Sequence, residues 1–108
     1  MFNKNTLQQL KNDVGEDVLS QLMQVFSAES TKLVQQLNEA NNDVHQIQRL
    51  AHSLKSCARS YGADQLADIA AEIESLAKSS KIDSNFEKLV LHLTKRHKKT
   101  IEQMPSFN

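Results

Sequence analysis

The sequence is poor in the residues that cross-link or interrupt protein chains. Its 108 residues include one cysteine, one proline and two glycines, with no tryptophan. Because Cys57 has no partner for an internal disulfide, a reducing compartment is favoured. The scarcity of turn-forming residues disfavours sheets of short strands. The polar start shows no signal peptide, and no apolar run approaches the ~20 residues of a membrane span, so we expect a cytoplasmic protein.

The charge of the chain is balanced overall but uneven along its length. The net charge of +0 gives no reason to expect nucleic acid or a membrane as a partner. Residues 95–99 read K-R-H-K-K, whereas Asp64, Asp68 and Glu72 recur at every fourth position. Runs of this kind are typical of solvated helix faces, which is what we expect of both.

Apolar residues recur at spacings of three and four along most of the chain, which predicts amphipathic helices. Asp43 with Gln46, and Ser84 with Glu87, have the spacing of residues that cap a helix start. Gly62 stands where helices commonly end in a left-handed residue. The predicted helices are residues 5–12, 16–41, 44–61, 64–79 and a last one that begins at Ser84.

The predicted helices define an all-α fold. Four long helices joined by short connections pack best as an antiparallel up-and-down four-helix bundle. The short N-terminal helix would cover one end. The length fits a single domain over residues 1–108.

One histidine is placed unusually on the predicted helix 44–61. At about 100° per residue, His52 lies about 150° from the centre of the apolar stripe, so its ring should face solvent. Lys55 lies one turn away, and Arg59 lies two turns away on the same side. The stripe itself comprises Ile47, Leu50, Ala51, Leu54, Ala58 and Tyr61.

The surroundings of His52 favour phosphoryl chemistry over two alternatives. A general base is normally oriented by a carboxylate, and none lies between Val44 and Gly62. His45 is too far along the helix to share a metal ion with His52, so we expect no metal site. A phosphoryl group on the ring could accept charge-assisted hydrogen bonds from the nearby cations. An exposed histidine beside cations is nevertheless also common on ordinary protein surfaces.

The stretch from Ala51 to Glu74, AHSLKSCARSYGADQLADIAAEIE, resembles the histidine phosphotransfer (HPt) family. That family's pattern is a histidine followed by apolar-Lys-Gly-small-small, an apolar-Gly-Ala step, a leucine and an apolar-Glu ending. The resemblance implies that His52 is the phosphorylated nucleophile, with Lys55 and Arg59 supporting the phosphoryl group. It also implies that Gly62 provides the sharp turn between two helices. Ser56 stands where the family usually has glycine.

The resemblance implies a relay rather than a kinase. The protein would shuttle a phosphoryl group between aspartates of receiver domains, in a hybrid sensor kinase, a response regulator or both. It would bind no cofactor of its own, since the sequence has no nucleotide-binding motif, and Mg²⁺ would reside on the receiver. We expect a monomer. The predicted partner contacts are Gln48, Arg49, Ser56 and Met23. Met23 could equally belong to the core.

Two other functions stay open on the sequence alone. A helical adaptor could bind a signalling partner without phosphoryl transfer, although intact His52 and Lys55 favour the relay. A small dimerisation module would extend its apolar stripes onto an exposed face, which a hydrodynamic mass would reveal.

Overall fold

Helices form where the apolar spacing predicts them, and their ends lie within two residues of the predicted ones. The structure is a computed structural model that describes residues 2–104, and helix is the regular structure found there. Among these residues, no helix is both long and apolar enough to cross a membrane. The helices are α1 (Lys4–Val14), α2 (Glu16–Glu39), α3 (Val44–Ser60), α4 (Asp64–Lys78) and α5 (Ser84–Glu102).

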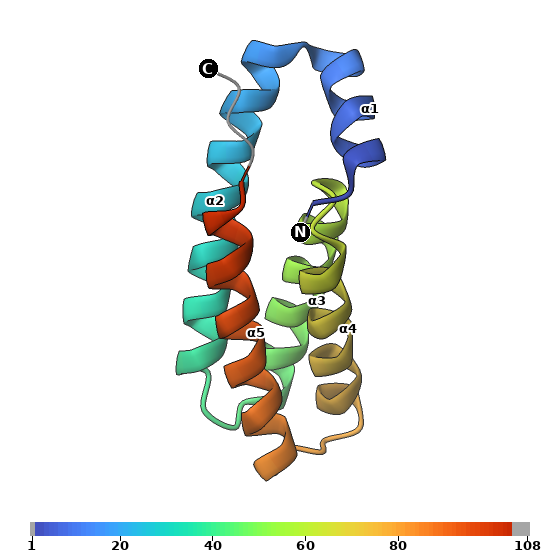
Figure 1. Ribbon diagram of the computed structural model, residues 1–108. Helices are drawn as coiled ribbons and strands as arrows, with labels where there is room; N and C mark the ends of the chain where they lie inside the picture. The colour runs from blue at the N-terminus through green and yellow to red at the C-terminus, as the bar shows by residue number, and fades with distance from the viewer. Residues whose placement is uncertain (1, 105–108) are drawn as a thin grey trace.

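The four long helices form the antiparallel bundle that was predicted (Figure 1). Helix α3 packs against α2 and α4, and α5 packs against the same two helices, so α3 and α5 occupy opposite corners. The predicted stripe of α3 faces inward, with Ile47, Ala51 and Leu54 at 0% exposure and Tyr61 partly buried. The aromatic ring of Phe26, also fully buried, packs on Tyr61 with ring centroids 5.3 Å apart.

Capping explains most helix starts, with one correction. The Asp43 side chain accepts a hydrogen bond from Gln46 N at the start of α3, as predicted. The expected cap at Ser84 is wrong, because the side chain of Asp83 accepts from the backbone N–H groups of Asn85 and Phe86 instead. An aspartate one residue earlier satisfies the same orphan donors, and a sequence pattern alone locates caps only to within a residue or so.

The start of the chain braces the turn between α3 and α4. Helix α2 extends past the ends of α3 and α4, and α1 folds back from it toward that turn (Figure 1). Asn3 N donates to Gly62 O at 2.6 Å, and Asn3 Nδ2 donates to Asp64 Oδ2 at 2.9 Å. Gly62 has φ +79°, and a Cβ there would meet Asn3 O at 3.1 Å. Glycine is therefore required both for the left-handed turn and for the close approach of the first residues.

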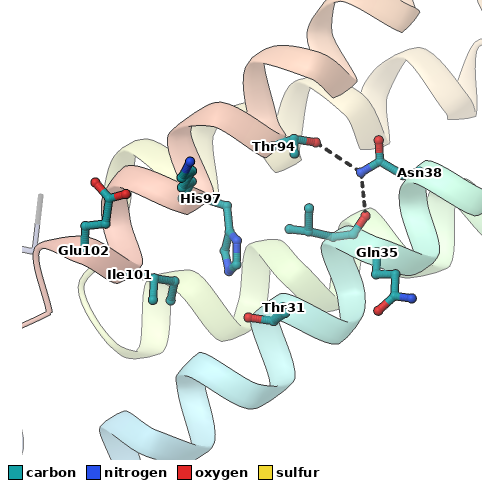
Figure 2. Close-up of a pocket in the computed structure, with 9 residues that line it drawn as sticks. Thr31, Gln35, Asn38, Thr94, His97, Ile101 and Glu102 are labelled. Atoms are coloured by element: carbon teal, nitrogen blue, oxygen red, sulfur yellow. Dashed lines mark hydrogen bonds between the residues drawn. The ribbon is translucent and has the colours of Figure 1, made fainter.

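The basic run of α5 is only partly the solvated face that was expected. Lys95, Lys98 and Lys99 are exposed, but His97 is 8% exposed. Its ring points from α5 toward α2 (Figure 2), where His97 Nε2 and Ser30 Oγ lie 2.9 Å apart in a buried hydrogen bond. The helical period places residue 97 with the apolar positions of α5, so the run contains one core residue.

Buried His97 should make the protein less stable in mild acid. Burial lowers the pKa of His97 below its ordinary value of 6.5. Below that value the unfolded chain binds a proton that the native state resists, so the free energy of unfolding falls until the pH passes the lowered pKa. Urea titrations between pH 8 and pH 5 should show this fall, and His97→Gln should reduce it. His92→Gln, at an exposed position of the same helix, should not; an equal effect of both variants would contradict the assignment.

Candidate functional site

The imidazole of His52 projects from the face of α3 that is opposite the core. Its side chain is 61% exposed, whereas the neighbouring Ala51 is fully buried. The prediction that this ring faces solvent is confirmed. The Gly62 turn returns the chain so that α4 runs antiparallel along α3, and this pairing brings a second helix to the edge of the ring.

A buried carboxylate from α4 joins His52 to Lys55. His52 Nδ1 and Glu74 Oε2 lie 2.8 Å apart, and Lys55 Nζ donates to Glu74 Oε1 at 2.6 Å. The side chain of Glu74 is 7% exposed, so both of its oxygens are held in place. Sequence reasoning found no orienting carboxylate because it considered only the residues between Val44 and Gly62. The helix α3 lacks one, but the neighbouring helix supplies it.

The charge state of Glu74 decides which nitrogen of His52 can react. The hydrogen bond from Lys55, followed by the one from His52 and the nearby charge of Lys78, lowers the pKa of Glu74, although burial by itself raises it. Glu74 is thus an ionised acceptor near neutral pH. An ionised carboxylate can only accept, so Nδ1 must carry the proton of the bond. In the neutral ring this leaves Nε2 with a free lone pair.

A hollow of about 440 Å³ opens beside the ring. Two predicted contact residues, Gln48 and Arg49, line it together with His45 and Lys78. Lys78 Nζ lies 3.7 Å from Glu74 Oε2, close enough to turn toward an anion in the hollow. Sequence reasoning missed both Glu74 and Lys78 as site residues. The sequence signal that could have identified them is the glutamate that ends the family pattern, followed by a lysine one helical turn later.

Other predicted site residues are not gathered at the ring. Arg59 Nη2 pairs with Asp68 Oδ1 at 3.4 Å, and within residues 2–104 it makes no hydrogen bond or ion pair with His52 or Glu74. Ser56 is exposed, as the prediction requires. The prediction of Met23 as a partner contact is wrong, because Met23 is 2% exposed and belongs to the core. The helical period places it with the inward positions of α2, a choice that the sequence left open.

The thiol of Cys57 is not activated. Cys57 is partly buried, and burial, followed by the negative charge of Glu29, raises the pKa of this thiol. A raised pKa keeps the thiol protonated, and the thiolate is the nucleophilic form.

We therefore expect Cys57→Ala to transfer phosphate at the rate of the unsubstituted protein. Single-turnover transfer from a phosphorylated receiver domain measures that rate, and circular dichroism controls for the fold. A large loss of transfer in a folded Cys57→Ala protein would restore the thiol as a participant.

An exposed imidazole, fixed by a buried carboxylate and flanked by cations on a helical bundle, defines the histidine phosphotransfer class. Comparison with known proteins agrees with the geometry. Residues 21–104 match the Hpt domain, and the chain belongs to that family. Histidine phosphotransfer in two-component signalling is accordingly its function, and receiver domains are the partners that the family implies.

Two relatives and one solved structure carry the comparison. The chain is 31% identical over 85 residues to the phosphorelay protein LuxU of Vibrio cholerae, covering 75% of this chain and 74% of that protein. It is 27% identical over 84 residues to LuxU of Vibrio harveyi, covering 76% and 74%. The crystal structure of histidine-containing phosphotransfer protein B (HptB) from Pseudomonas aeruginosa shares the fold, with a TM-score of 0.88, 21% identity and coverage of 94% of this chain and 88% of that one.

Proposed function

We propose that Nε2 of His52 accepts a phosphoryl group from the aspartyl phosphate of one receiver domain and passes it to the aspartate of another. One observation carries the assignment. The hydrogen bond between His52 Nδ1 and Glu74 assigns the proton to Nδ1, on a ring whose side chain is 61% exposed. The remaining nitrogen is therefore both nucleophilic and open to an incoming protein.

The step forms one bond and breaks one. The lone pair of Nε2 attacks phosphorus, and the bond from phosphorus to the aspartyl oxygen breaks with its electron pair returning to that carboxylate. The ring gains positive charge because it still holds the Nδ1 proton. Glu74, 2.8 Å from Nδ1, stabilises that charge. The reverse step uses the same arrangement, since a cationic ring leaves phosphorus more readily than a neutral one does.

Cations around the ring hold the transferred group. Lys55 and Lys78 both lie within 4 Å of Glu74 and can turn from it to the phosphoryl oxygens, and Arg49 lines the same hollow. Each exposed charge pair contributes roughly 0.2–1 kcal/mol, which positions the group but does not supply the chemistry. Glu74 is already engaged by His52 and Lys55, so we place Mg²⁺ on the receiver, where it would neutralise the phosphoryl oxygens.

The docking surface surrounds the ring. Gln48, Arg49 and Ser56 remain the proposed polar contacts, and all three lie on α3 with His52. Met23 is 2% exposed and is no longer among the proposed contacts. We propose a transient interface of this kind with the receiver of a hybrid sensor kinase and with that of a response regulator.

Transfer of label tests the proposal. A receiver domain labelled on its aspartate with radioactive phosphate is mixed with this protein and sampled over time. Label should appear on this chain, be lost in acid and persist in alkali, as expected of a phosphoramidate. Nitrogen NMR of the product should place phosphorus on Nε2 of His52. Receiver binding without any transfer of label would instead favour the adaptor.

Lys55→Ala should slow transfer about twofold to fivefold without unfolding the bundle, since one partly exposed cation is lost from the phosphoryl group. The variant should also raise the pKa of Glu74, because the hydrogen bond from Lys55 is the main cause of its lowering. Rapid-quench transfer and carbon NMR of Glu74 measure the two effects. Lys32→Ala, at an exposed position of α2, is the matched control. An unchanged rate in Lys55→Ala would remove this lysine from the mechanism.

A further inference from the structure

The outer face of α5 carries a straight row of basic side chains. Lys88, His92, Lys95 and Lys99, here called the α5 ridge, follow one another at intervals of three and four residues, and all four are exposed. At 1.5 Å per residue the ridge spans about 16 Å. No aspartate or glutamate occurs between Glu87 and Glu102.

No residue of the α5 ridge forms an ion pair within residues 2–104. The ion pairs seen among residues 2–104 are centred on Glu74 and Asp68 of α4, and none includes a ridge residue. Within the ridge, Lys95 and Lys99 are one helical turn apart, which destabilises a helix because like charges repel. The ridge therefore has an electrostatic cost that no intramolecular ion pair of the described residues offsets.

An apolar hollow borders the same helix. It measures about 510 Å³ and lies between α2 and α5 (Figure 2). Val34, the ring of His97 and Ile101 line it, and Lys98 and Glu102 stand among its other lining residues. Leu91, beside the ridge on α5, is 54% exposed. None of the four ridge residues lines the hollow, but Lys98, which lies between Lys95 and Lys99 in the sequence, brings positive charge to its edge.

We propose that the α5 ridge and this hollow form a second docking surface, which binds an acidic segment of a partner protein that carries one large apolar side chain. Carboxylates would pair with the ridge while the apolar side chain fills the hollow. A single short ridge offers few phosphate contacts for a nucleic acid. A membrane-binding helix would need a broad apolar face, and the exposed large apolar residue of α5 is Leu91 alone among the described residues.

The second surface leaves the phosphotransfer site free. His52 stands on α3 toward α4, and α3 and α5 occupy opposite corners of the bundle. A partner on α5 could therefore remain bound while a receiver domain engages His52, which raises the local concentration of a tethered receiver. Binding at α5 does not depend on transfer at His52.

A synthetic peptide tests the proposal. The probe is a fluorescein-labelled helical peptide with glutamates along one face and a single phenylalanine, titrated with the full-length protein and followed by anisotropy. Lys95→Glu with Lys99→Glu should weaken binding about tenfold or more, and added salt should weaken binding to the unsubstituted protein. The matched control, Lys4→Glu with Lys11→Glu on α1, should change it by no more than about twofold. Replacing the phenylalanine of the peptide by alanine should weaken binding several-fold.

Two further measurements decide the outcome. Amide chemical shifts should change along α5 and residues 31–38 of α2, and His52→Gln should bind the peptide normally. Shifts centred on α3, or equal losses in the α5 and α1 double variants, would overturn the proposal. Tighter binding to an oligonucleotide or to phosphatidylglycerol vesicles than to the peptide would assign the ridge to another class of partner and would also overturn it.

Discussion

His52→Gln should abolish phosphoryl acceptance from a labelled receiver domain. Glutamine retains hydrogen-bonding capacity but has no ring nitrogen with a free lone pair, so no phosphoramidate can form. The side chain is 61% exposed, and its loss removes no core packing. The bundle should therefore stay folded while transfer falls to background. Rapid-quench gels for label and thermal unfolding for stability measure the two quantities.

Two controls make the His52 result specific. His45→Gln, on the same helix and lining the same hollow, should retain transfer. Receiver binding by His52→Gln, measured by NMR shifts or calorimetry, should stay within about threefold, since exposed polar contacts contribute little each. Label that persists on a folded His52→Gln protein would disprove the assignment of the nucleophile.

Glu74→Ala is expected to slow transfer by about ten- to a hundredfold, by analogy with the carboxylates that orient metal-bound histidines. The substitution removes the acceptor at 2.8 Å from Nδ1, so the ring loses its fixed tautomer and the charge that stabilises the phosphorylated form. Glu74→Gln should fall between the unsubstituted protein and Glu74→Ala, because an amide oxygen still accepts from Nδ1 but carries no charge. Single-turnover rates for the three proteins measure this order.

The pH profile separates positioning from a purely structural role. The pKa of Glu74 is lowered, chiefly by Lys55, so this carboxylate stays ionised as the pH falls through the ordinary range of glutamate. Its contribution to the transfer rate should accordingly persist to lower pH than that of an unperturbed glutamate. The fall in rate that accompanies protonation of Glu74 should be absent in Glu74→Gln. Glu72→Gln, exposed on the same helix, is the control. Equal rates in Glu74→Ala and the unsubstituted protein would remove Glu74 from the mechanism.

The exposure of His52 could be predicted because helical periodicity is a local property. A ring about 150° from the apolar stripe must face away from the core if the helix forms, and α3 forms as expected. The order and ends of the helices followed from the same spacing. Local pattern was also sufficient for the turn at Gly62, whose φ of +79° suits glycine.

The pairing partners could not be predicted in the same way. Glu74 reaches His52 because α3 and α4 pack side by side, and helix packing brings together residues 22 positions apart. A wheel drawn on one helix contains no information about its neighbour. Met23 and His97 are a different case, because the helical period places both with the inward positions of their helices, and both are buried. The ion pair between Arg59 and Asp68 also joins α3 to α4, so the sequence of α3 alone could not predict it.

The bracing of the α3–α4 turn by Asn3 couples the beginning of the chain to the chemistry. The match to the Hpt domain starts at residue 21, so α1 lies before the residues of that match. A protein shortened to that region would leave Gly62 O without the Asn3 amide and Asp64 without the Asn3 side chain. Because the turn sets how α4 registers against α3, its loosening would shift Glu74 relative to His52. The first residues are therefore expected to stabilise the pairing of α3 with α4 from the turn at Gly62.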